Sequence, residues 1–241
     1  MRIVNDQSYQ IEQKLKERSE EEKRKSLAFY RELASDDPDT YEPKVAELLQ
    51  SLAMEYDDCA DEQCEQMFLE ALDIRRRLRD KALEQYEPAV AETARNLGMY
   101  YGLIERYKKS EQYILEALEN FRRCAQRNPE TYEPDVAQVL YLLGVQYNIN
   151  KLYKKSEPLY LEALDIWQRH DSDDSEVKTY FVEQTQEALD NLRADMADVS
   201  DEEMKQFEEE YLAMEDAVPY EEELDDWLND VDSDSEEEKE E

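Results

Sequence analysis

The fold of this chain is decided by residues 136–167, VAQVLYLLGVQYNINKLYKKSEPLYLEALDIW. Two series of apolar or small residues follow one another in it, and both have the offsets 0, 4, 7, 8 and 11. The first series begins at Val136 and the second at Ser156, and each lies on one face of a helix with a period near 3.6 residues. The stretch therefore predicts two amphipathic helices joined by a short polar link. Such a hairpin needs neighbours to cover its apolar face.

The tripeptide Tyr-Glu-Pro occurs three times, beginning at Tyr41, Tyr86 and Tyr132, so the internal periods are 45 and 46 residues. The two-helix pattern follows each copy, and an internal repeat of this length predicts stacked copies of one unit. Small residues that allow close helix packing recur at fixed points. They are Ala53, Gly98, Gly144, Ala71, Ala117 and Ala163.

The prolines of the tripeptides are predicted to mark helix starts, at Pro43, Pro88 and Pro134. The first helical position suits proline because its N–H would have no partner there. The Tyr two residues earlier would then pack on the fourth helical position as a hydrophobic staple.

The third copy has the pattern Leu140-x-x-Leu143-Gly144-x-x-Tyr147, then Ser156-x-x-x-Tyr160, then Ala163. This pattern resembles the tetratricopeptide repeat (TPR). The repeat is longer than the usual unit of about 34 residues and lacks its Trp. In these respects it is similar to the long-repeat subclass of kinesin light chain and bacterial TPR proteins. The resemblance implies an all-α solenoid of helical hairpins with a concave groove for a partner protein.

The repeats are expected at residues 41–85, 86–131 and 132–170. Residues 1–40 should form an N-terminal helix that packs on the array. In residues 171–217, the offsets 0, 4, 7, 8 and 11 return from Phe181, which indicates the first helix of an incomplete fourth unit. Ser200-x-x-Glu203 is a capping box that opens another helix. These helices would cap the exposed end of the stack.

The composition is strongly acidic, with 64 Asp and Glu against 29 Lys and Arg and a formal net charge of -35 at pH 7. Binding to nucleic acid or to an anionic membrane needs the opposite charge, so protein partners are favoured. Residues 1–10 lack the apolar core of a signal peptide, and we expect a cytoplasmic chain. The three cysteines lack metal-ligand spacing and are interpreted as packing residues in a reducing compartment.

We expect no catalytic site, no cofactor and no metal site, and hence no enzyme. The single histidine, His170, follows a predicted helix end and is interpreted as a helix-end cation. Three glycines cannot form a phosphate-binding loop. An EF-hand-like spacing of acids near the C-terminus lacks the turn glycine and the second helix, so we attribute it to chance. Its residues are Asp230, Asp232, Asp234 and Glu241.

The TPR resemblance assigns a groove to the outward residues of each first helix, which in the family takes extended or short helical peptides. The predicted groove residues are Met54, Arg95, Asn96, Met99, Tyr141, Val145 and Asn148. This mixture suits a peptide with both apolar and polar groups. Alternatively, some of these side chains pack between neighbouring repeats. The family's Asn ladder survives only at Asn96, and its clamp for chaperone C-termini is unmatched, so chaperone-tail recognition is not expected.

Residues 218–241 form an acidic tail that is predicted to be disordered, because it has too little apolar surface to offset the entropy of ordering. Leu224, Trp227 and Leu228 interrupt the acids, either as a short linear motif or as a segment that packs on the cap. The tail would dock on the repeat body through arginines near the ends of the second helices. These arginines are Arg75, Arg76, Arg77, Arg79, Arg122 and Arg123.

The sequence therefore predicts a non-enzymatic scaffold that binds a partner peptide or helix in the groove, with the acidic tail for regulation or solubility. The alternative is an acidic chaperone-like protein or nucleic-acid mimic that binds basic partners through its charge. The oligomeric state stays open.

Overall fold

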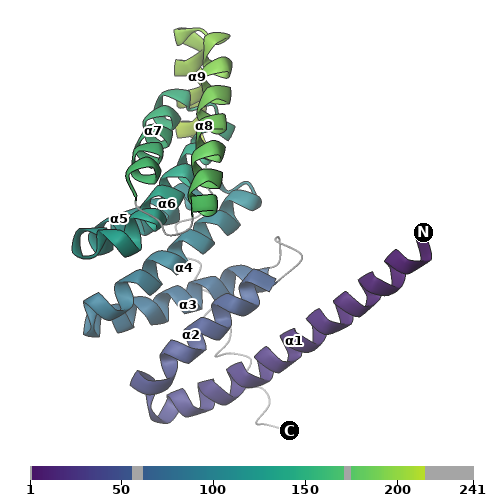
Figure 1. Ribbon diagram of the computed structural model, residues 1–241. Coiled ribbons are helices and arrows are strands. Elements are labelled where there is room, and N and C mark those ends of the chain that lie inside the picture. Colours follow the sequence, from purple (N-terminus) through teal and green to yellow (C-terminus); the bar gives the residue numbers. More distant parts are fainter. Residues whose placement is uncertain (1, 56–61, 171–174, 215–241) are drawn as a thin grey trace.

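Figure 1 shows the computed structural model, which describes residues 2–55, 62–170 and 175–214 and the side chains within 18–55, 62–170 and 177–214. The described residues form helices and no strand. The helices are α1 (Arg2–Asp36), α2 (Pro38–Glu55), α3 (Glu62–Lys81), α4 (Leu83–Leu103), α5 (Tyr107–Arg127), α6 (Pro129–Ile149), α7 (Tyr153–Arg169), α8 (Ser175–Ala197) and α9 (Asp201–Ala213). None of these helices is long and apolar enough to cross a membrane.

From α1 to α8, helices that follow one another in sequence pack side by side, so this part of the chain is a stack of helical hairpins (Figure 1). The three hairpins are α2–α3, α4–α5 and α6–α7, and in each we call the earlier member the first helix and the later member the second helix. The helix α8 packs on α7 in the place of a further first helix. The expected all-α solenoid of stacked hairpins is thus confirmed.

Each hairpin is closed at the same place, where a small residue of the first helix faces the second helix. The hydroxyl of Ser110 donates to the carbonyl oxygen of Gly98 at 2.7 Å, and Ser156 donates to Gly144 at 2.7 Å. The buried thiol of Cys64 takes this place in the first hairpin. The recurring small residues therefore let the two helices of a hairpin approach closely.

A second set of polar contacts joins neighbouring hairpins at equivalent positions. The hydroxyl of Tyr101 donates to Glu65 at 2.6 Å, and 46 residues later the hydroxyl of Tyr147 donates to Glu111 at 2.5 Å. The equivalent contact one repeat later is an ion pair, in which Arg193 of α8 donates to Glu157 of α7 at 2.8 Å. The helix α8 therefore continues the register of the first helices.

The end of α1 behaves as the second helix of a unit that precedes the first hairpin. Its Arg31 donates to Glu70 of α3 at 2.5 Å. Equivalent ion pairs join successive second helices further along, from Arg76 to Glu116 and from Arg122 to Glu162. The N-terminal half of α1 projects away from the stack (Figure 1).

The predicted helix starts at Pro43, Pro88 and Pro134 are wrong, because each first helix begins five residues earlier. Two of the helices have another proline at their first position, Pro38 and Pro129. The repeated prolines lie inside the helices instead, and the preceding tyrosines cannot act as staples from outside. For example, Tyr41 packs on Tyr30 of α1, with 6.2 Å between ring centroids.

The glutamate of each Tyr-Glu-Pro tripeptide fixes the first helix to the end of its own second helix. The carboxylate of Glu42 accepts from Arg77 at 2.8 Å, and that of Glu133 accepts from Arg169 at 2.7 Å. The second copy, Glu87, is fully buried. The tripeptide is therefore a packing device repeated in each unit.

Candidate functional site

The first helices of the second and third hairpins and the two helices that follow enclose a pocket of about 310 Å³. Three successive first-helix positions, α4, α6 and α8, contribute to its walls, and α7 contributes one aromatic side chain. The lining residues are Arg95, Asn96, Met99, Gln138, Tyr141, Leu142, Trp167 and Phe181. The pocket therefore spans the groove face of two adjacent repeats.

Two aromatic rings form one wall of this pocket. The indole of Trp167 stacks on the ring of Phe181, with 4.7 Å between centroids and 5° between planes. The side chain of Trp167 is only 4% exposed, and its Nε1 has no hydrogen-bond partner among the described residues. A buried N–H without a partner is costly, so the indole is held in this position by its packing against Phe181.

Arg95 supplies positive charge to the same pocket, although part of its charge is already neutralised. Its guanidinium donates to Asp135 and to Gln138, each at 3.3 Å, and lies 5.8 Å from the ring centroid of Phe121. Burial raises the pKa of the Asp135 carboxyl above its ordinary value, while the nearby Arg95 opposes that shift. Arg95 and Gln138, which both line the pocket, give it a polar edge that can donate and accept hydrogen bonds.

The structure brings four of the predicted groove residues together, since Arg95, Asn96, Met99 and Tyr141 all line the pocket. The amide of Asn96 also contacts the sulfur of Met54 at 3.7 Å, which places this exposed methionine on the adjoining part of the groove. The helical period gives the outward positions of the first helices, and the TPR resemblance assigns those positions to the groove.

The other two predicted residues lie outside the pocket. Val145 packs on the cluster of buried residues that joins α6, α7 and α8. The Oδ1 atom of Asn148 is buried and has no hydrogen-bond partner among the described residues. Sequence reasoning missed Trp167 and Phe181 as lining residues, because both belong to the offset series that predict the packing faces of their own helices.

The arginines proposed as docking points for the acidic tail already have partners within the repeat body. Arg75 is buried and donates to Gln50 at 2.5 Å and to Thr93. The other five pair with carboxylates of the stack. The structure therefore gives no support to these side chains as free counter-charges. The tail itself, with Leu224, Trp227 and Leu228, lies outside the described residues.

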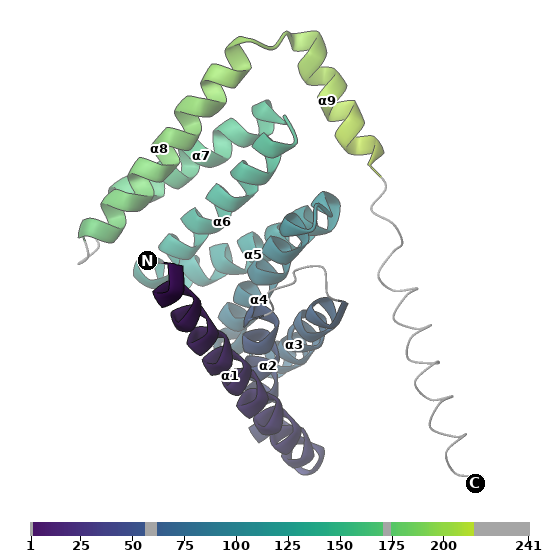
Figure 2. The same cartoon turned by 90° about the vertical axis from the view of Figure 1, so that its right-hand side faces the viewer.

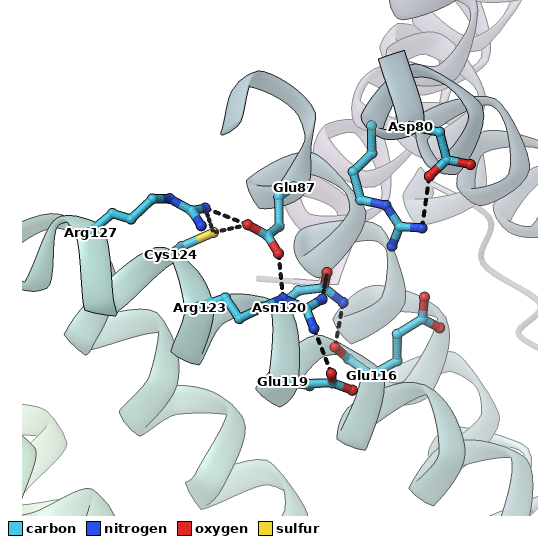
Figure 3. Close-up of polar contacts among 9 residues, drawn as sticks. Asp80, Glu87, Glu116, Glu119, Asn120, Arg123, Cys124 and Arg127 are labelled. Atoms are coloured by element: carbon cyan, nitrogen blue, oxygen red, sulfur yellow. Dashed lines mark hydrogen bonds and ion pairs between the residues drawn. The ribbon is translucent and has the colours of Figure 1, made fainter. Parts of the chain in front are cut away.

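The densest polar cluster surrounds the buried carboxylate of Glu87 (Figure 3). It accepts from Arg123 at 2.5 Å and from Arg127, and the thiol of Cys124 lies 3.9 Å away. Burial alone would raise the pKa of Glu87, but the hydrogen bonds from Arg127 and Arg123 outweigh it and hold that pKa below 4.5. Burial also raises the pKa of the Cys124 thiol to about 11, so it is a poor nucleophile. This cluster therefore joins α4 to α5 and is not a reaction centre.

Within residues 2–55, 62–170 and 175–214, no three histidine, cysteine or acidic side chains are grouped so that they could hold a metal ion. Cys64 and Cys124 are buried and free, whereas Cys59 is outside the described residues. The EF-hand-like spacing near the C-terminus is outside them as well.

No family model and no curated protein matches this sequence. Among solved structures, the chain is similar to BtubC (BKLC) from P. vanneervenii, with 17% identity, a TM-score of 0.39, and coverage of 85% of this chain and 95% of that one. It is also similar to the MamA protein, with 16% identity, a TM-score of 0.36, and coverage of 85% and 92%. Similarity at this level carries no conclusion about function, and the kinesin light chain subclass stays a prediction.

Proposed function

We propose that the chain is a non-enzymatic scaffold whose groove binds an extended segment of a partner protein. One apolar side chain of that segment enters the pocket and packs on Tyr141 and on the paired rings of Trp167 and Phe181. The pocket of about 310 Å³, whose lining includes these three aromatic side chains, is the observation that carries this proposal.

The charge of the chain adds a preference for the flanks of the segment. A net charge of -35 produces a long-range field that attracts cations and repels anions. Lysines or arginines on either side of the apolar side chain therefore speed up association, while the pocket sets specificity.

Trp167 provides a direct test, because the sequence contains only one other tryptophan, Trp227. In a full chain with Trp227→Phe, all tryptophan fluorescence reports on the pocket. Peptides selected by phage display against this chain should be apolar at the centre and basic at the flanks. Each should shift the emission of Trp167 in a saturable manner.

Two variants distinguish binding in the pocket from nonspecific binding to the surface of the chain. Tyr141→Ala removes a pocket wall and should weaken the selected peptides roughly tenfold, which corresponds to about 1.4 kcal/mol. Leu161→Ala is the matched control, because Leu161 is an exposed apolar residue that does not line the pocket. Selection that yields only peptides indifferent to Tyr141→Ala would contradict the proposal.

The alternative function, binding of basic proteins through charge alone, depends on a tail that lies outside the described residues and stays a prediction. Salt separates the two functions. Charge-driven binding weakens strongly once the screening length falls to about 3 Å near 1 M salt, whereas pocket binding largely survives. A chain that ends at Met214 should keep pocket binding and lose binding through the tail.

A further inference from the structure

The helix α9 leaves the end of the stack and returns across its edge. Figure 2 shows α8 and α9 meeting at one end and diverging like an inverted V. The ring of Tyr211, which is 1% exposed, lies 6.5 Å from the ring of Tyr147, and its hydroxyl is 2.9 Å from the carboxylate of Glu111. The amine of Lys108 lies 3.9 Å from the centre of the same ring. The C-terminal end of α9 is therefore anchored near the start of α5.

The first half of α9 is held by charge and by apolar packing, since Met204 and Phe207 pack on the buried cluster of α7 and α8. Asp201 pairs with Lys154 at 2.7 Å, and the amine of Lys151 lies 4.6 Å from the ring centre of Phe207. A pocket of about 230 Å³ remains between this half of α9 and the start of α7. We call the surface that receives α9 the lysine seat. It consists of Lys108, Glu111, Tyr147, Lys151, Lys154 and Lys155.

Both the charge of α9 and the spacing of its apolar residues are complementary to the lysine seat. The helix carries six carboxylates and one lysine, while the seat presents four lysines in a chain whose net charge is -35. The residues of α9 that face the seat recur at helical spacing, at Met204, Phe207 and Tyr211. An acidic amphipathic helix with this spacing is therefore the kind of helix that the seat accepts.

The preceding repeat shows how the same edge is arranged without α9. There, Glu65 accepts from the hydroxyl of Tyr101 at 2.6 Å and pairs with Lys109 at 3.4 Å. The motif Tyr-Lys-Lys-Ser-Glu supplies this lysine and recurs one repeat later, at residues 153–157.

In the next repeat, α9 has taken the place of that lysine. Glu111 accepts from Tyr147 at 2.5 Å and contacts Tyr211 of α9. Lys155, the counterpart of the lysine that pairs in the preceding repeat, points to Glu208 of α9 instead, at 3.7 Å. If α9 leaves, Lys155 can pair with Glu111 as in the repeat before. That new pair offsets part of the cost of release.

Few contacts bury α9 against the rest of the chain. Tyr211 is the only residue of α9 that is buried, and the neighbouring Leu212 is 64% exposed. The side chains of the Lys154–Asp201 pair are 63% and 87% exposed, and ion pairs that open to water stabilise little. Segments with few buried contacts open locally before the rest of a protein unfolds.

We propose that α9 is an exchangeable occupant of the lysine seat, and that a partner protein displaces it with an acidic amphipathic helix of its own. The displacing helix carries two aromatic residues at the spacing of Phe207 and Tyr211 and carboxylates at the positions of Asp201 and Glu208. This surface lies at the turn ends of the hairpins and does not depend on the function proposed for the groove pocket.

A labelled peptide of residues 199–214 tests the proposal as a stand-in for the partner helix. It is titrated against the full wild-type chain and against full-length Tyr211→Ala, in which α9 has lost its anchor. Because the attached α9 competes with the peptide, the apparent affinity for Tyr211→Ala should be roughly tenfold higher than for wild type. Leu212→Ala is the matched control and should behave as wild type.

A second set of variants tests the contribution of the lysines in the seat. Lys154→Glu combined with Tyr211→Ala should weaken the peptide roughly threefold to fivefold, as loss of an exposed ion pair predicts. A peptide with Asp201→Lys should recover that affinity on the Lys154→Glu chain. A peptide with Phe207→Ala and Tyr211→Ala should not bind.

Three results would overturn the proposal. The first is that the peptide shows no saturable binding to the Tyr211→Ala chain, although that chain keeps the circular dichroism of a helical protein. The second is that, in hydrogen exchange of the wild-type chain, the amides of α9 exchange only together with those of α6. The third is a concentration-dependent dimer that the peptide dissociates, since it would assign the seat to a second copy and not to a partner protein.

Discussion

The ring of Phe181 lies parallel to the indole of Trp167, at 4.7 Å between centroids, and so ties α8 to α7. Because Phe181 also lines the groove pocket, the pocket needs α8 as well as the second and third hairpins. A helix that the sequence describes as half of an incomplete repeat therefore both covers the end of the stack and completes the candidate site.

Replacing this ring should affect stability and binding together. Phe181→Ala removes a partly buried aromatic side chain, and we expect unfolding to become easier by about 2 kcal/mol, below the range for fully buried Phe. Chemical denaturation measures the change. In the Trp227→Phe background, the emission of Trp167 should shift to the red as water reaches the indole. An unchanged emission in the folded variant would contradict the stacked arrangement.

The closely packed glycines give a second prediction. A Cβ at Gly144 would lie 2.7 Å from Cε1 of the buried Tyr160, and one at Gly98 would lie 2.6 Å from Ile114. Gly144→Ala and Gly98→Ala should each destabilise the chain by about 1–3 kcal/mol, the usual cost of overpacking. At Gly102 the nearest atom is the hydroxyl oxygen of Ser110 at 3.3 Å, so a Cβ there requires a shift of only a few tenths of an ångström. Gly102→Ala should therefore change thermal stability little, and an equal loss at all three positions would contradict this account.

The sequence predicts the stack well because one repeated offset series fixes which face of every helix is buried. It fails at Pro43, Pro88 and Pro134 because a proline at the sixth helical position loses a backbone hydrogen bond, which predicts a helix start there, yet the packing of the stack outweighs this local cost. Only the surrounding contacts, such as Asn128 accepting from the backbone N–H of Thr131 at 3.4 Å, decide where the helix begins.

The candidate site is predicted only in part, for a related reason. Arg95, Asn96, Met99 and Tyr141 lie on first helices, where the helical period gives the outward positions and the TPR resemblance assigns them to the groove. Trp167 and Phe181 line the pocket because α8 packs on α7, and the spacing of residues within one helix does not predict which side chains of two packed helices meet. The sequence also does not predict that Lys155 pairs with Glu208 while its counterpart Lys109 pairs with Glu65, since this difference depends on where α9 returns.

A third prediction concerns acid and the buried carboxylate of Glu87. Its pKa is lower in the folded chain than its ordinary value of 4.5, so it stabilises the fold fully above about pH 4.5. This contribution is lost as the pH falls through the lowered folded value. Glu87→Gln should therefore destabilise the chain by about 1–3 kcal/mol at pH 7, less than for a fully enclosed pair because Arg123 and Arg127 are partly exposed.

The pH dependence separates this effect from the other acids. The difference in unfolding free energy between wild type and Glu87→Gln should shrink as the pH is lowered from 6 to 3, a range that brackets the ordinary value of about 4.5. Glu119→Gln is the matched control, since Glu119 also pairs with Arg123 but is 70% exposed. A constant difference across this range would show that Glu87 acts through packing and not through its charge.

The last prediction concerns the ion pairs that join successive second helices. Arg122 and Glu162 lie 2.7 Å apart, yet their side chains are 47% and 45% exposed. Water screens such a pair, so a double-mutant cycle with Arg122→Ala and Glu162→Ala should give a coupling below about 1 kcal/mol that falls with added salt. The same cycle on Arg123 and Glu87 should give a larger coupling that salt changes little, because Glu87 is fully buried. Comparable couplings would mean that the exposed series stabilises the stack as much as the buried cluster does.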